Sequence, residues 1–146
     1  MQLPIEMSVG IDPGSAHLGI ALVAPQLQLV ELFQCEMTPT KDPIEFMTRI
    51  HQVLSRCVNF KEYHMHMIIE GPSYGDRFGQ VKLERVRTSA VWWAINKYIT
   101  PYIVSPKSIR KQVFGNGDIK AHEVWKELPP DVAAALSCAT YQRTSV

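Results

Sequence analysis

The chain of 146 residues has a hydrophobic fraction of 46% and a charged fraction of 20%, which is the balance of an ordinary globular protein with a core of its own. No apolar run approaches the ~20 residues that a membrane span needs, so we expect no membrane partner. The formal net charge of +1 conceals an asymmetry: residues 1–73 carry eight acidic and four basic side chains, and residues 74–146 carry six and eleven. This distribution would suit one face that binds a polyanion, and it would equally suit scattered surface charge.

The cysteines and the chain start indicate the compartment and the domain organisation. Cys35, Cys57 and Cys138 have no metal-type spacing, and the first residues lack the basic start and apolar core of a secretory signal. We therefore expect reduced thiols in a cytoplasmic protein. Neither a repeat nor a linker interrupts the chain, so residues 1–146 are expected to form a single domain.

The first half of the chain predicts three antiparallel strands, a helix and a fourth strand. The strands are expected at residues 5–11, 18–23, 27–36 and 64–70. Asp42 and Pro43 have the residue types of a helix N-cap and first helical position, and this helix is expected to end near residue 59. Because a crossover helix precedes it, the fourth strand should lie parallel to the first.

Two histidines alternate on the fourth predicted strand. His64 and His66 would face one side of the sheet, as a pair of metal ligands does. No other residue completes such a site in the sequence pattern. We interpret both as polar residues at the entry of the strand.

The second half of the chain predicts a long helix, a short strand and three shorter helices. These elements are expected at residues 80–99, 102–104, 107–113, 119–126 and 132–141, with Asp118 as the cap of the helix at 119–126. Trp92 and Trp93 are adjacent and cannot share a helix face. One of them must lie away from the core, either at a subunit interface or beneath the protein's own loops.

Asp12 and Glu70 each end a predicted strand. The predicted elements follow one another as three strands, a helix, a strand, a helix, a strand and a helix, which indicates an α/β protein. The RNase H-like arrangement has the same order, and in it the ends of strands one and four are neighbours. Two carboxylates so close repel unless a cation lies between them, and oxygen ligands in a partly open site suit Mg²⁺. The simpler alternatives are an aspartate that caps its own turn and a strand-end glutamate that faces water.

Five stretches in chain order add to this pattern. They are 10–15 with Gly19 following, 68–75, 105–111, 115–117 with Lys120, and 128–136. Together they resemble the RuvC-type Holliday junction resolvases, in particular the short phage or virus-like members. The Asp-Pro-Gly loop alone also resembles the phosphate loop of sugar kinases and actin-like ATPases, but those proteins need two such domains and this chain is too short for them.

The resemblance implies a fold, an activity and a set of acids. The fold is RNase H-like, with a mixed five-stranded sheet of three antiparallel and then parallel strands, flanked by helices. The activity is that of a homodimeric crossover junction endodeoxyribonuclease, which nicks opposed strands of a four-way DNA junction with two Mg²⁺ ions, for which Mn²⁺ could substitute. Asp12, Glu70 and Asp131 would be the catalytic residues and metal ligands.

The chain departs from the family on the last predicted helix. The family carries two metal-binding residues three positions apart there, whereas this chain has Asp131 and Ala134. Three explanations are open: an engineered Asp→Ala change, a natural variant, or a shifted register in which Asp131 is the essential acid. Asp131 could also be a plain helix N-cap after the two prolines.

The resemblance also indicates residues that contact DNA. Gly115, Asn116 and Gly117 precede a predicted helix and could offer N–H groups to a phosphate, or form an ordinary glycine turn. Arg87 and Arg110 are expected in a basic rim around the acids, and Tyr74 or Phe78 would be the aromatic residue that wedges into the junction. The predicted DNA-binding residues are Ser15, Tyr74, Arg77, Lys82, Arg85, Lys107, Lys111, Asn116 and Lys120. A non-cleaving junction-binding module and an RNase H-like nuclease acting on other branched DNA or on RNA are the alternative functions.

Overall fold

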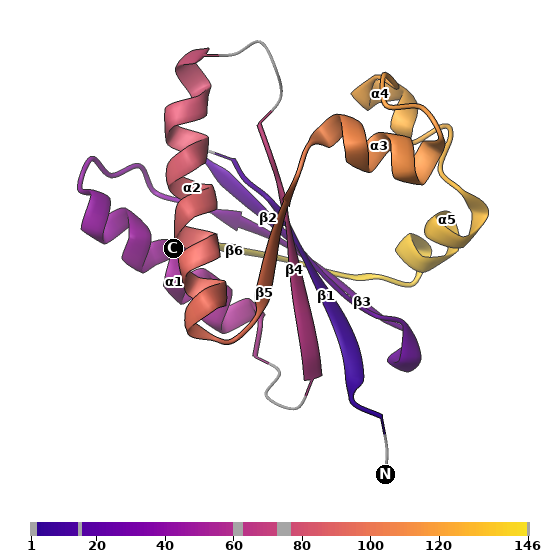
Figure 1. Cartoon of the computed structure of the whole chain (residues 1–146), viewed down its shortest axis with the longest axis horizontal. Helices are drawn as coiled ribbons and strands as arrows, with labels where there is room; N and C mark the ends of the chain where they lie inside the picture. The colour runs from indigo at the N-terminus through magenta and orange to yellow at the C-terminus, as the bar shows by residue number, and fades with distance from the viewer. Residues whose placement is uncertain (1–2, 15, 60–62, 73–76, 146) are drawn as a thin grey trace.

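A computed structural model describes residues 3–14, 16–59, 63–72 and 77–145. Its centre is one six-stranded sheet in the order β5-β4-β1-β2-β3-β6 (Figure 1). The strands are β1 (Ile5–Asp12), β2 (His17–Ala24), β3 (Leu29–Glu36), β4 (Tyr63–Glu70), β5 (Thr100–Val104) and β6 (Thr140–Ser145). β1, β2 and β3 are antiparallel neighbours, whereas β4 is parallel to β1, β5 to β4, and β6 to β3.

Alternation along β1 divides the sheet into two faces. Met7, Val9 and Ile11 are buried, while Glu6 and Asp12 are exposed. Successive residues of a strand point to opposite faces, so the buried set defines a core face and the other set defines what we call the acidic face. The same alternation in β4 places Glu70 on the acidic face, because Met65, Met67 and Ile69 are buried.

Two helices cover the core face. α1 (Pro43–Cys57) and α2 (Arg77–Asn96) pack on it side by side (Figure 1). Asp42 caps α1 as predicted, since its Oδ1 accepts hydrogen bonds from the backbone N–H groups of Ile44 and Glu45 at 2.9 and 3.4 Å. Pro43 occupies the first turn, where its missing N–H costs nothing.

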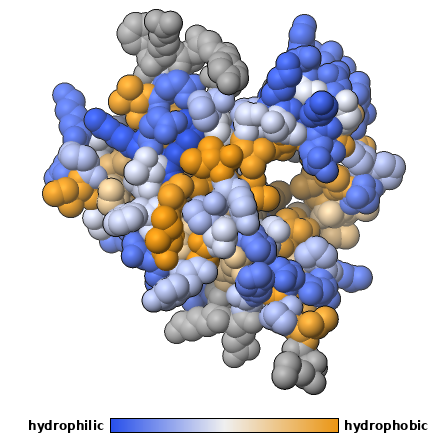
Figure 2. Space-filling view, viewed as in Figure 1, coloured by the Kyte–Doolittle hydropathy of each residue, from blue (hydrophilic) through white to orange (hydrophobic). Residues whose placement is uncertain are grey.

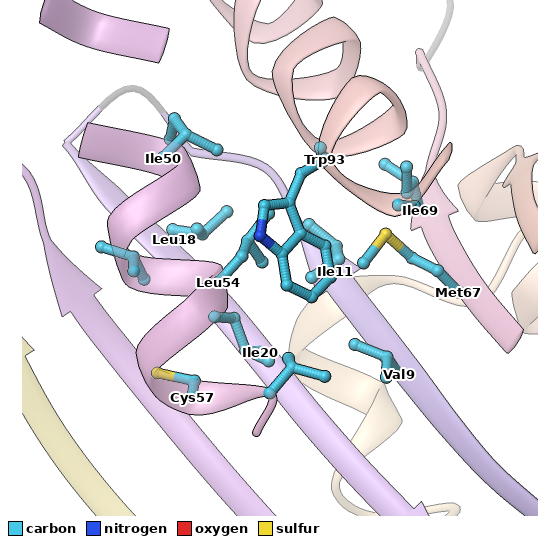
Figure 3. Packing of buried hydrophobic residues seen from close by; sticks show 14 of the residues in the cluster. Val9, Ile11, Leu18, Ile20, Ile50, Leu54, Cys57, Met67, Ile69 and Trp93 are labelled. Atoms are coloured by element: carbon cyan, nitrogen blue, oxygen red, sulfur yellow. The ribbon is translucent and has the colours of Figure 1, made fainter. Parts of the chain in front are cut away.

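Trp93 lies in the centre of this core. Its ring stands among Leu54, Ile11 and Met67 (Figure 3), and its Nε1 donates to Ser55 Oγ at 2.9 Å. Trp92 on the same helix is 54% exposed. The prediction that the two tryptophans cannot share a face is therefore confirmed.

The acidic face is covered loosely. α3 (Pro106–Phe114), α4 (Ala121–Val124) and α5 (Pro130–Ser137) stand on this side, opposite α1 and α2 (Figure 1). Neither α3 nor α5 contains a buried residue. Figure 2 shows hydrophobic side chains over the middle of the molecule next to a hollow, which is the groove described below. None of the described helices is both long and apolar enough to cross a membrane.

The structure corrects three details of the predicted elements. The sheet has six strands rather than five, because the last helix ends at Ser137 and Thr140–Ser145 pairs with the edge of β3. Backbone groups on a free strand edge are unpaired, and a segment with Thr and Tyr is well suited to bond them. The helix expected at 119–126 is only Ala121–Val124, and its N-cap is Lys120 rather than Asp118. A short 3-10 helix, η1 (Pro25–Leu27), precedes β3.

Candidate functional site

Asp12 and Glu70 end neighbouring parallel strands. The register pairs Ile11 with Ile69, so the two acids are the next residues on each strand and both lie on the acidic face. Figure 1 shows the end of β4 between α2 and α3. The predicted juxtaposition of these two carboxylates is present in the fold.

Both acids line a groove of about 770 Å³ on the acidic face. Among the described residues that line it, Asp12 and Glu70 are the only acids. The rest of the wall is largely apolar and includes Ile68, Val104, Ile109 and Val113. The carboxylates are therefore the charged groups of an otherwise largely apolar groove.

The surroundings of the two acids oppose their ionisation. Desolvation raises the pKa of Asp12, and desolvation followed by the negative charge of Asp12 raises the pKa of Glu70. The positive charges of Arg110 and Arg87 act in the opposite direction on the pKa of Glu70. Paired carboxylates with raised pKa values are what a cation-binding centre has before the cation enters.

The residues fit one hard divalent cation. Two carboxylate groups offer oxygen ligands, which Mg²⁺ prefers, and they lie at an accessible groove where water could complete the coordination. A second ion would need further protein ligands, and the described residues of the groove offer no third acid.

Arg87 is a buried support of Glu70 rather than part of a solvent-facing rim. The residue is 3% exposed, and its Nε donates to the Glu70 backbone carbonyl at 2.9 Å. Its Nη1 also bonds Gln80 and Glu84. The sequence did not distinguish Arg87 from the other basic residues of α2, because only burial separates them.

Two glycines determine where Asp12 lies. At Gly14 a Cβ atom would stand 2.0 Å from the His17 carbonyl oxygen, so the turn after Asp12 admits no side chain there. Gly19 is the β2 partner of Asp12, and a Cβ atom on it would be 3.2 Å from Asp12 Cβ. The glycine therefore leaves room for the carboxylate.

Asp131 is not brought to the other two acids. It is exposed near the start of α5, does not line the groove, and is not among the charges that shift the pKa of Glu70. It is not the N-cap of α5 either, because that position is Pro129. Ala134 is exposed on the same helix.

Part of the predicted DNA-binding set gathers around α3. Lys107, Arg110, Lys111 and Gly117 line a second hollow of about 500 Å³ next to Pro72, close behind Glu70 in the chain. Lys107 Nζ is 2.9 Å from Asp118 Oδ1.

The glycine turn has contacts within the protein. Asn116 Oδ1 accepts a hydrogen bond from the Asp118 N–H at 3.0 Å, and Gly115 ends α3 with a φ of 74°. Lys120 is exposed at the start of α4. These residues thus have structural roles that do not depend on a bound phosphate.

The other predicted DNA contacts lie elsewhere or outside the described residues. Lys82 and Arg85 are exposed on α2, and Arg85 lines a groove shared with α1 residues such as Phe46. Ser15, Tyr74 and the side chains of Arg77 and Phe78 are not in the described part of the structure.

Comparison with known proteins supports the resemblance. No family model matches the chain. Two curated proteins, each named crossover junction endodeoxyribonuclease RuvC, are 29% identical to it. The match to the Cytophaga hutchinsonii protein covers 80% of this chain and 60% of that protein, and the match to the Salinibacter ruber protein covers 80% and 66%. The chain thus spans a little under two thirds of the length of these relatives.

Solved structures share the fold. Thermus thermophilus RuvC matches with a TM-score of 0.64 and 20% identity over 90% of this chain and 89% of that one. The same protein in complex with a Holliday junction substrate matches with a TM-score of 0.62 and 23% identity, over 90% and 88%. The chain is therefore similar in sequence to RuvC proteins, and it shares with the solved RuvC structures an α/β fold of the RNase H-like arrangement.

Proposed function

We propose that the chain is a Holliday junction resolvase, a Mg²⁺-dependent, structure-selective endonuclease that nicks opposed strands of a four-way DNA junction. The observation that carries the proposal is the pairing of Asp12 and Glu70 at adjacent strand ends in a RuvC-like chain. The free cysteines suit a protein that works in the cytoplasm.

Asp12 and Glu70 would hold the metal, with Mg²⁺ as the expected ion and Mn²⁺ as a substitute. A metal bound between carboxylates supplies an activated water and stabilises charge on a phosphate that is being cleaved. Arg87 holds the Glu70 backbone through its Nε hydrogen bond, and its charge favours the ionised, metal-binding form of that acid. Gly19 leaves Asp12 free to face the groove.

The hollow beside α3 would bind the phosphate backbone. Lys107, Arg110 and Lys111 bring positive charge next to Pro72, two residues beyond Glu70. Contacts of this kind position DNA without reading its sequence. They suit a nuclease that selects a branched shape.

The test is a nicking assay on a labelled four-way junction, with linear duplex, flap and RNA–DNA hybrid substrates as competitors. We expect Mg²⁺-dependent, symmetric nicks with the junction, and loss of cleavage in Asp12→Asn and in Glu70→Gln. Glu127→Gln is the matched control, because Glu127 is an exposed acid that does not line the groove. A preference for the flap or the hybrid would reassign the substrate.

A junction-binding module without nuclease activity is the second candidate. The observations that favour it are Ala134 three residues after Asp131, where the family resemblance implies a second metal ligand, and the absence of α5 residues from the described lining of the groove that holds Asp12 and Glu70. If Ala134 replaces a metal ligand, Ala134→Asp should increase Mg²⁺-dependent nicking. Tight junction binding with no nicking in either protein would identify the binding module.

A further inference from the structure

A second group of metal-ligand side chains lies on the acidic face, at the other end of the same two strands. Glu6 is six residues before Asp12 on β1, and His64 is six residues before Glu70 on β4. At ~3.3 Å per residue this places Glu6 and His64 about 20 Å from the paired acids, and His66, four residues before Glu70, about 13 Å away. The group is therefore separate from the proposed nuclease centre.

Parallel pairing brings three ligands together. Glu6 is the register partner of His64, and His66 follows on the same face of β4. His64 Nδ1 lies 3.0 Å from Glu6 Oε1, and His66 Nε2 lies 3.3 Å from Glu6 Oε2. All three ligand atoms lie within 4.8 Å of one another.

The spacing suits a single small ion. With metal–ligand bonds of about 2.0–2.1 Å, the ligand atoms of a tetrahedral site are roughly 3.3 Å apart. The Glu6 contacts of 3.0 and 3.3 Å with His64 and His66 are close to this spacing.

We propose that Glu6, His64 and His66 form a binding site for a divalent transition metal of the zinc class. Imidazole nitrogens favour Zn²⁺ and its neighbours, whereas Mg²⁺ prefers oxygen ligands throughout. Two histidines and one carboxylate leave a coordination position open for water. Within the described ranges, this is the one group of three or more such side chains close enough to share an ion.

The site would join the beginnings of β1 and β4. These strands are central in the sheet but reach each other from distant parts of the chain, 58 residues apart at Glu6 and His64. A ligand that binds only the folded state stabilises it. We therefore expect a bound metal that stabilises the sheet and is distinct from the Mg²⁺ of the nuclease centre.

The test is Zn²⁺ titration of the chelator-treated protein by calorimetry, with Co²⁺ absorption as a report on coordination. We expect one Zn²⁺ per chain, visible Co²⁺ bands, and affinity at least about tenfold weaker in His64→Ala, His66→Ala and Glu6→Gln. Saturating Zn²⁺ should raise the unfolding midpoint of the wild type by roughly 5 °C, and should not raise that of the His64→Ala/His66→Ala double variant.

His122→Ala and Cys138→Ser are the matched controls, because both residues are exposed and lie outside the group. Asp12→Asn should bind Zn²⁺ as the wild type does, whether or not the nuclease proposal holds. Circular dichroism checks that each variant is folded. Wild-type affinity in the folded double variant, or the absence of saturable binding in the wild type, would overturn the proposal.

Discussion

Asp12 and Glu70 show how a site residue can lower stability. Their pKa values are raised in the fold, so the folded state binds protons more tightly at these groups than the unfolded chain does. Their unfavourable contribution is absent below an unfolded pKa near 4 and develops as pH rises from there through the raised pKa values.

Asp12→Asn should therefore unfold at a higher temperature than the wild type at pH 7, because the uncharged side chain avoids this cost. The gain should vanish near pH 3.5, where the wild-type acid is protonated as well. Thermal unfolding followed by circular dichroism at both pH values measures the difference. A variant less stable than the wild type at pH 7 would show that Asp12 has a stabilising partner.

Gly19 offers a finer test of the same centre. A Cβ atom on Gly19 would stand 3.2 Å from Asp12 Cβ, so Gly19→Ala should shift the carboxylate by a few tenths of an ångström. We expect Mg²⁺-dependent nicking to fall about tenfold or more while the protein stays folded, because catalysis depends on position at this scale. Gly10→Ala is the control, since its Cβ would meet nothing nearer than 3.6 Å. Equal activity in the two variants would contradict this.

The two groups of side chains on the acidic face differ in whether the sequence could predict them. The pairing of Asp12 with Glu70 could be predicted because each acid ends a recognisable strand. The contact of Glu6 with His64 and His66 was missed, although the parallel pairing of the two strands was predicted correctly. The sequence did not show which residue of β1 pairs with which residue of β4. A shift of one residue in this register would move Glu6 to the other face of the sheet.

At the scale of the element, local signals located most boundaries. Asp42 and Pro43 fixed the start of α1, and alternation fixed β1 and β4. β6 was not foreseen, because its pairing with β3 joins residues more than a hundred positions apart and its own sequence follows a run of small helix formers. The position of α5 could not be predicted either, since the helix has no buried residue and no local pattern determines where it lies.

α3 carries the charges that we expect to bind DNA phosphate. Lys111→Gln should weaken binding to all junction sequences about equally, and should reduce the slope of log affinity against log salt by about 1. Fluorescence anisotropy at several salt concentrations measures both quantities. Lys126→Gln is the control, because Lys126 is exposed but does not line the hollow. An unchanged slope in Lys111→Gln would remove that residue from the interface.

At the scale of the whole molecule, the exposed apolar side chains of α2 suggest how two chains would associate. Trp92 is 54% exposed and Ile95 is 49% exposed, next to a core that is already filled by Trp93. Aromatic residues are enriched at subunit interfaces. The homodimer and the single-domain organisation both stay predictions.

Sedimentation equilibrium can test the dimer. Trp92→Glu should convert the protein to a monomer at concentrations where the wild type is dimeric, since it places a charge in an apolar contact. Trp125→Glu is the matched control, because Trp125 is an exposed tryptophan on another part of the chain. A wild type that is monomeric at all concentrations, or a Trp125→Glu variant that dissociates instead, would contradict the assignment.

The sixth strand has a consequence for solubility. β6 is nearly all polar and exposed at the edge of the sheet, and it covers β3, which contains Leu29, Leu32 and Phe33. Arg56 helps to hold it there through a hydrogen bond to Thr144 Oγ1 at 3.2 Å. A chain cut after Ala139 would present an apolar strand with open backbone groups, which is a template for intermolecular β-pairing. We therefore expect Thr140–Ser145 to protect the protein against aggregation, although this strand lies three positions from β1 in the sheet.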